Sequence, residues 1–244
     1  MADLVEVIHE NYVRARETIN LSALRCGRNP AEVKLVVVSK AQPLAVIEAA
    51  VEAGIRVFGE NYPEEAMEKT RHFRAINDIE WHMIGHLQSR KARLIVESFC
   101  YLHSLDSIHL AEKLNSLLSA NQKPLPVLLE MNVSGEESKF GWSAWDEDRW
   151  IDLVPVFNGL LNFPQIKISG LMTMPPFFED AEQARPYFIK LRKLGDFLAL
   201  KIPDVDWSEL SMGTSIDFSV AVEEGATFVR VGQAILGSRP VKRV

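Results

Sequence analysis

Hydrophobic residues along the chain fall into short apolar runs, which are typical of buried strands, and into longer stretches with helical spacing. The short runs predict eight strands, at residues 34–39, 55–58, 80–84, 99–104, 125–133, 166–172, 208–211 and 227–231. The helical stretches lie between them, at 43–53, from about 63, from about 88, and at 107–120, 145–161, 180–200 and 217–224. Strands that alternate with helices in this way predict βα units and a parallel sheet buried on both faces.

Eight such units within 244 residues favour an α/β fold closed into a single (β/α)8 TIM barrel over an open doubly wound sheet. No linker rich in Pro, Gly or Ser divides the chain, so we expect one domain over residues 1–244. Residues 3–25 precede the first strand and have apolar residues between charged positions, which predicts an extra amphipathic N-terminal helix. We expect this helix to pack across the bottom or the side of the barrel.

Charge and composition narrow the classes of function. The net charge is -6, and the basic residues are mixed with acidic ones, which disfavours nucleic-acid binding. The start of the chain lacks a signal-peptide pattern and no segment approaches the roughly 18 apolar residues of a membrane helix, so neither export nor membrane insertion is expected. Cys26 and Cys100 are far apart and lack a metal-binding spacing, so we expect no disulfide and a cytoplasmic protein.

Polar and small residues follow the ends of the predicted strands, where TIM barrels build their active face. They are Lys40, Gly59-Glu60-Asn61, His82, Gly85-His86, Asp106, Asn132, Met174, Ser211 to Ser215 and Gly232. Partial desolvation of Lys40 at a strand end would lower its pKa and supply the neutral amine that Schiff-base chemistry requires. His82 and His86 are four residues apart, but on a strand and its following loop rather than on one helix face, so we expect no metal site.

The segment Ser211-Met212-Gly213-Thr214-Ser215 and the later Arg230-Val231-Gly232 together predict a phosphate-binding site. The first segment follows the seventh strand, and the second lies at the end of the eighth. TIM barrels often bind a phosphate at these two places. Ser215 is also expected to cap the helix that begins near Asp217. Strand alternation places Arg230 and Gly232 on one side, so the guanidinium lies either in the barrel mouth or at the rim, paired with a carboxylate. With Lys40, these segments indicate a phosphorylated aldehyde held at both ends.

Several ordered segments resemble one known family over nearly the whole chain. They are Val38-Ser39-Lys40, Phe58 to Tyr62, Trp81 to Gln88, Ser138 to Gly141, Gly170 to Met174, Leu210 to Gly213, Val229 to Gly232 and Ile235 to Gly237. On these segments the chain is similar to the pyridoxal phosphate homeostasis proteins, which resemble the N-terminal barrel of alanine racemase.

The resemblance implies pyridoxal 5'-phosphate (PLP) as the cofactor, held as an internal aldimine on Lys40. It implies that Ser215 and the backbone around Gly232 and Gln233 hold the phosphate, and that Arg230 faces the pyridine nitrogen. The full set of candidate cofactor-binding residues is Lys40, Asn61, His82, Met174, Ser211, Gly213, Thr214, Ser215, Arg230, Gly232 and Gln233. A guanidinium cannot accept a hydrogen bond from a protonated pyridinium, so Arg230 would keep the ring nitrogen unprotonated and weaken the cofactor as an electron sink.

Three positions depart from the pattern of the family. Methionine is common where this chain has Thr214, methionine or tyrosine where it has Phe218, and a small or acidic residue where it has Gln233. Thr214 adds a hydroxyl beside the expected phosphate, so the departures affect the detail of the cofactor contacts rather than cofactor binding.

The leading interpretation is a carrier and regulator of PLP that influences amino- and keto-acid pools, without robust turnover. Expected partners are PLP and PLP-dependent apoenzymes, and the expected state is a monomer. An active PLP-dependent racemase, with His82 or His86 as the second base, is an alternative. The two-domain racemase takes that base from a C-terminal β-domain, whereas this chain ends just after the last barrel unit, which argues against racemisation. A Schiff-base aldolase without PLP is a further alternative, which absorbance would distinguish.

Overall fold

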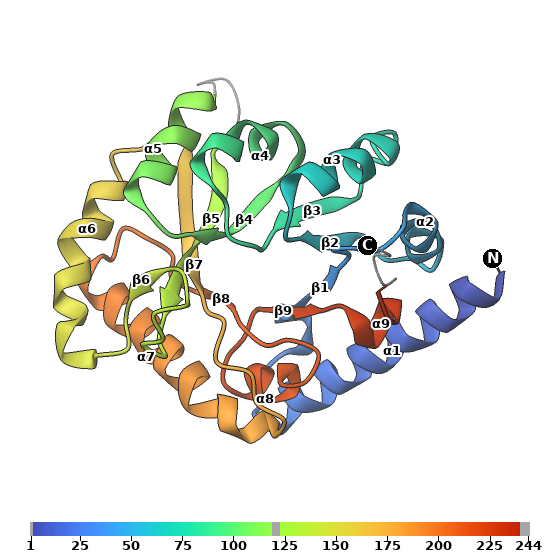
Figure 1. Cartoon of the computed structure of the whole chain (residues 1–244). Coiled ribbons are helices and arrows are strands. Elements are labelled where there is room, and N and C mark those ends of the chain that lie inside the picture. The colour runs from blue at the N-terminus through green and yellow to red at the C-terminus, as the bar shows by residue number, and fades with distance from the viewer. Residues whose placement is uncertain (1, 119–122, 240–244) are drawn as a thin grey trace.

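The computed structural model describes residues 2–118 and 123–239 and contains a closed parallel barrel. Figure 1 shows a central ring of strands surrounded by helices. The barrel strands are β1 (Lys34–Val38), β2 (Val57–Glu60), β3 (Glu80–Met83), β4 (Tyr101–Leu105), β5 (Leu125–Asn132), β7 (Ile166–Met172), β8 (Glu209–Ser211) and β9 (Phe228–Val231). Pairing of β4 with β5 closes the ring. The predicted eight-stranded TIM barrel is therefore confirmed.

The helices lie outside the ring of strands (Figure 1). They are α1 (Ala2–Arg25), α2 (Leu44–Glu52), α3 (Pro63–His72), α4 (Ala92–Ser98), α5 (Ile108–Leu117), α6 (Leu153–Leu160), α7 (Arg185–Lys201), α8 (Phe218–Glu223) and α9 (Gln233–Leu236). The N-terminal helix α1 packs along α2, α8 and α9, so it covers the side of the barrel. No helix in the part of the chain that the structure describes is long and apolar enough to cross a membrane.

Element boundaries differ from the prediction where polar side chains set the first turn. The helices predicted at 145–161 and 180–200 each begin as a 3-10 turn, at Glu147–Asp152 and Ala181–Ala184. In each case the preceding aspartate, Asp146 or Asp180, accepts a hydrogen bond from the N–H two residues later. This local bond replaces the regular start of an α-helix.

Two further differences concern strands. The second strand begins at Val57 rather than at residue 55, because the N–H of Ile55 donates to the carbonyl of Ala50 and so belongs to the turn that ends α2. A short strand that was not predicted, β6 (Trp142–Ser143), pairs with the end of β5. Residues 119–120, at the end of the predicted helix 107–120, lie outside the described residues.

The barrel interior is filled by side chains below the carboxyl ends of the strands. Its apolar part is a small cluster separate from the larger core between strands and helices, formed by Val36, Ile84, Tyr101, Leu128, Met172 and Phe228. Polar side chains share this interior, and His82, His103 and Ser211 are fully buried. A filled interior leaves the carboxyl end of the barrel as the place where a ligand can enter.

Candidate functional site

A cavity of about 130 Å³ opens at the carboxyl ends of the barrel strands. Most of the residues predicted for the site line it, namely Lys40, Asn61, Met174, Thr214, Ser215, Arg230, Gly232 and Gln233. The structure adds Val38, Ile84 and Arg239, which the sequence reasoning did not find. The cavity therefore joins residues from both ends of the chain, as the strand-end pattern predicts.

Lys40 follows β1 in a turn that aims its side chain into the cavity. The next residue, Ala41, has φ +57°, a left-handed conformation that costs a non-glycine residue free energy. The N–H of Ala41 donates to Glu65 Oε1 at 2.6 Å, which holds the turn in place. Burial lowers the pKa of Lys40, the charges of Arg239 and Arg230 lower it further, and only Glu60 opposes them. A larger fraction of the amine is therefore neutral than in an exposed lysine.

A buried ion-pair network lies beneath the Lys40 turn. Lys69 Nζ donates to the carbonyl of Ser39 at 2.7 Å, to Glu60 Oε1 at 2.7 Å and to Glu65 Oε1 at 2.8 Å. The side chains of Lys69 and Glu60 are 5% and 0% exposed. Burial raises the pKa of Glu60, and the adjacent Lys69 ammonium opposes that rise. Because Lys69 contacts the residue before Lys40, this network fixes the end of β1.

Two glycines allow the opposite wall of the cavity to form. Gly213 has φ +91°, and a Cβ at this position would lie 2.5 Å from the Cβ of Ala221. A Cβ on Gly232 would lie 3.1 Å from the carbonyl oxygen of Val38. Only glycine fits at position 213 without displacing α8. At position 232, glycine allows the end of β9 to lie close to β1.

The hydroxyls of this wall have different hydrogen-bond roles. Ser215 Oγ accepts from the N–H of Gly232 at 3.3 Å, so its own proton remains available to a ligand. Thr214 Oγ1 donates to Asp217 Oδ1 at 3.0 Å, and the Thr214 N–H donates to the same oxygen. The prediction that Ser215 caps the helix is wrong. Asp217 occupies the N-cap position of α8, and its carboxylate is held by Thr214 instead.

Arg230 points into the barrel mouth and is only 3% exposed. Nη1 donates to Ser211 Oγ, and Nη2 donates to the carbonyl of Thr173 and to Met174 Sδ, both at 2.9 Å. No carboxylate among the described residues forms an ion pair with it. Burial lowers the pKa of Arg230 to about 10, so the guanidinium remains charged at neutral pH. Two placements of the Arg230 guanidinium were predicted, and the structure confirms the one in the barrel mouth.

The cavity is positively charged. Lys40, Arg230 and Arg239 line it, and none of the described lining residues is acidic. Asn61 Oδ1 is buried without a hydrogen-bond partner. A buried acceptor without a partner carries a free-energy penalty that a ligand with a donor group can remove. The lining therefore suits an anionic ligand that also brings a hydrogen-bond donor.

Three predicted residues do not line the cavity: His82, Ser211 and Gly213. His82 lies within the barrel core, where its ring nitrogens face His103 and Glu80. His86, the other histidine considered as a base, pairs through Nδ1 with Asp106 Oδ2 at 2.8 Å and also lies outside the cavity lining. Neither histidine is therefore placed to act in the cavity.

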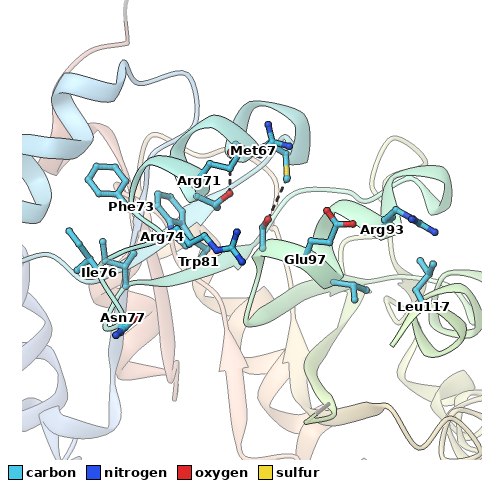
Figure 2. Close-up of a pocket in the computed structure, with 14 residues that line it drawn as sticks. Met67, Arg71, Phe73, Arg74, Ile76, Asn77, Trp81, Arg93, Glu97 and Leu117 are labelled. Carbon is cyan, nitrogen blue, oxygen red and sulfur yellow. Dashed lines mark hydrogen bonds between the residues drawn. The ribbon is translucent and has the colours of Figure 1, made fainter. Parts of the chain in front are cut away.

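A larger groove of about 830 Å³ lies outside the barrel, beside α3 and α4 (Figure 2). Figure 2 shows the side chains of Arg71, Arg74 and Arg93 along it, together with Glu97. None of the predicted site residues lines this groove. We assign the functional site to the smaller cavity, because only there do a lysine of lowered pKa and uncommitted polar groups face one another.

Comparison with known proteins gives the family. The sequence model described as "Alanine racemase, N-terminal domain" matches residues 16–240. The pyridoxal phosphate homeostasis protein of Escherichia coli K12 is 38% identical over 236 residues, which cover 95% of this chain and 97% of that protein. The protein of the same name from Aquifex aeolicus is 39% identical, covering 94% of this chain and 97% of that one. The chain belongs to the pyridoxal phosphate homeostasis protein family.

Solved structures agree with this assignment. PipY of Synechococcus elongatus with PLP bound is 35% identical, covers 94% of this chain and 100% of its own, and superposes with a TM-score of 0.78. The alanine racemase of Corynebacterium glutamicum has a TM-score of 0.67 at 19% identity, and the match covers 63% of that chain. The racemase shares the barrel fold.

In this member of the pyridoxal phosphate homeostasis family, Glu130 is a buried carboxyl group that sequence reasoning did not find. It lies near the end of β5, is 8% exposed, and its Oε2 has no hydrogen-bond partner. Burial raises the pKa of Glu130 to about 7; Asp106 adds to the rise, and Arg230 and Lys139 oppose it. The carboxyl group therefore titrates near neutral pH.

Replacing this group by glutamine should change how stability depends on pH. Since the folded pKa of Glu130 is raised above its unfolded value, ionisation destabilises the wild type as pH rises from about 4.5 to about 7. Relative to wild type, Glu130→Gln should gain about 2–3 kcal/mol between pH 5 and pH 8, from about 1.4 kcal/mol per pKa unit. Urea unfolding at the two pH values measures this difference. An identical difference at both pH values would contradict the buried, titrating carboxyl.

Proposed function

We propose that this protein binds PLP in the cavity at the carboxyl end of the barrel and acts as a carrier that controls PLP supply, and through it amino- and keto-acid pools. One observation carries the proposal. Lys40, with its lowered pKa, shares a positively charged cavity with Ser215 and Arg230. The names of the relatives and the PLP bound to PipY support it.

The lining residues fit the chemical groups of PLP. Lys40 would hold the cofactor covalently, because its neutral amine is the group that an aldehyde such as that of PLP requires. The Ser215 hydroxyl and the backbone at Gly232 and Gln233 would hold the phosphate, whereas Thr214 Oγ1 lines the cavity but donates its proton to Asp217. The Ser215 O–H would donate to the phosphate, and the unpartnered Oδ1 of Asn61 would accept a hydrogen bond from the cofactor. Anionic phosphate also offsets the positive charge of the lining.

Arg230 is the reason to prefer a carrier to a racemase. A charged guanidinium has only donors, so Arg230 would favour an unprotonated pyridine nitrogen, and an unprotonated ring is a weak electron sink. Neither His82 nor His86 lines the cavity as a second base. We therefore propose that proton abstraction from a bound amino acid is slow or absent.

An absorbance spectrum tests the function together with α-proton exchange. After PLP is added and the unbound PLP is removed, the protein should absorb in the near ultraviolet or the visible range, and L- and D-alanine in deuterated water should exchange little of their α-proton. Absence of that absorbance would refute PLP binding and favour a Schiff-base aldolase. Rapid exchange that depends on Lys40 would favour an active PLP enzyme instead.

Ser215→Ala should weaken retention of PLP more than Ser211→Ala. Ser215 has a free hydroxyl proton in the cavity, whereas Ser211 is fully buried and contacts Arg230 and His103. Loss of a hydrogen bond to a charged group costs about 1.5–3 kcal/mol. Transfer of PLP to a competing apoenzyme during dialysis measures the difference. Equal retention by Ser215→Ala and wild type would argue against this phosphate site.

The setting in which the carrier acts also belongs to the proposal. We propose a single-domain cytoplasmic monomer that hands PLP to PLP-dependent apoenzymes. Cys26 and Cys100 are free thiols, which is in keeping with a reducing compartment.

A further inference from the structure

A continuous chain of hydrogen bonds crosses the barrel core from the cavity to the opposite end. It begins where Arg230 Nη1 contacts Ser211 Oγ, and Ser211 Oγ lies 2.8 Å from His103 Nδ1. His103 Nε2 lies 2.9 Å from His82 Nδ1, and His82 Nε2 lies 3.3 Å from Glu80 Oε2. The three inner side chains are completely buried, whereas the Glu80 side chain is 49% exposed at the amino end of β3.

The charged ends fix the direction of every bond in the chain. Arg230 can only donate, so Ser211 Oγ accepts from it and turns its own proton to His103 Nδ1. A neutral His103 then carries its proton on Nε2 and donates to His82 Nδ1. His82 in turn carries its proton on Nε2 and donates to the Glu80 carboxylate. Both histidines are thereby held in the Nε2–H tautomer.

The surroundings keep both histidines neutral. Burial lowers the pKa of His82, and it lowers that of His103 well below the usual value. His82 stacks on Tyr101 with ring centroids 5.2 Å apart, and His103 meets the edge of Phe228 at 4.9 Å. Aromatic rings therefore pack against the faces and edges of both imidazoles. Among the described residues, the polar contacts of the two imidazoles are the hydrogen bonds of the chain.

The Glu80 end of the chain is compatible with an ionised carboxylate. The hydrogen bond from His82 lowers the pKa of Glu80, and Lys34 adds a positive charge nearby. The Sγ of Cys100 lies within 4.8 Å of ligand atoms of His82 and Glu80, so the three could also hold a metal ion. The positive charge of Lys34 disfavours a cation here, and His82 Nε2 already makes a hydrogen bond with Glu80. We therefore assign a proton, rather than a metal ion, to His82 Nε2.

We propose that Glu80 is a positioning residue for Arg230 and acts on it through His82, His103 and Ser211. Each donor in the chain points away from the guanidinium and toward the carboxylate, so the bond dipoles favour a positive charge at one end and a negative charge at the other. Ser211 can then accept from Arg230 Nη1, which leaves Nη2 on Thr173 and Met174 at the cavity. Without the carboxylate, both histidines can reverse their tautomers, and Ser211 Oγ then faces two donors.

Histidine tautomers test the chain directly. Long-range proton–nitrogen correlation spectra of the full-length protein should show His82 and His103 protonated on Nε2 alone. Glu80→Leu, which changes a half-exposed side chain, should put part of the proton population on Nδ1 of both rings, and Glu80→Asp should restore the single tautomer. Nδ1 protonation of either ring in wild type, or unchanged tautomers in Glu80→Leu, would overturn the proposal.

Release of PLP tests the effect on Arg230, and this readout rests on the proposed function. Glu80→Leu should release PLP at least about fivefold faster than wild type, the lower end of typical coupling between distant sites. Glu209→Leu is the matched control and should release PLP at the wild-type rate. Glu209 lies at the same end of the barrel, but it accepts a hydrogen bond from Tyr101 and is not part of the chain. Equal release by Glu80→Leu and wild type would overturn the proposal. A wild type that binds no PLP would instead refute the proposed function and leave the tautomer result to decide on the chain.

Discussion

Lys40→Ala is expected to abolish attachment of PLP by borohydride reduction, whereas the wild type should carry the reduced pyridoxyl group on the peptide that contains Lys40. Lys40 is the only lysine among the described residues that line the cavity, and burial lowers its pKa. The variant should fold normally, because a partly exposed side chain at a strand end contributes little to the core. Mass spectrometry of the reduced, digested protein and a thermal melt measure the two effects.

Lys139→Ala is the matched control for Lys40→Ala. Its ammonium also lies near the barrel mouth, where it donates to the carbonyl of Pro175 at 3.3 Å, but it does not line the cavity. This variant should keep full labelling of Lys40. A reduced pyridoxyl group on Lys139 or Lys69 in the wild type would show that the reacting amine is not the one at the end of β1.

The barrel and much of its mouth could be predicted from the sequence because both follow from local patterns. Parallel strands covered on both faces are nearly continuous apolar runs, and such runs are visible between helical stretches. The carboxyl ends of all strands in a closed parallel barrel meet at one face, so residues as distant as Lys40 and Ser215 could be assigned to one site. Val38 and Ile84 were missed because apolar residues near a strand end carry no chemical signal.

The misplacement of His82 in the cavity comes from strand alternation. β3 ends at Met83, and alternation puts Glu80, His82 and Ile84 on the interior side in successive layers. Ile84 reaches the cavity, so His82 lies one layer deeper. A strand-end rule without the exact layer cannot distinguish these positions.

Contacts between distant elements could not be predicted from the sequence. Arg239 lies after α9, where no periodic pattern places it, and it still lines the cavity. Lys69 lies on α3 and looks like an ordinary i,i+4 partner of Glu65, a pair that is usually exposed. Only the fold brings Glu60 and the carbonyl of Ser39 to the same ammonium and buries it.

Lys69→Met is expected to lower the free energy of unfolding by about 3–5 kcal/mol, the usual cost of removing one partner of a buried ion pair. The methionine fills a similar volume, so the loss reports the charge and its hydrogen bonds rather than a cavity. Glu60 would remain buried without its cation, and the carbonyl of Ser39 would lose its donor. Urea unfolding at neutral pH measures the change.

Two further variants separate the buried charge from the loss of a lysine. Lys91→Met removes an exposed ion pair with Glu64, whose side chain is 52% exposed, so it should change stability by about 1 kcal/mol or less. Adding Glu60→Gln to Lys69→Met should recover part of the lost stability, because the double variant no longer buries an uncompensated charge. If the double variant were less stable than Lys69→Met by the full cost of Glu60→Gln alone, the two side chains would not be coupled, and the Lys40 turn would owe its position to the Ala41–Glu65 hydrogen bond instead.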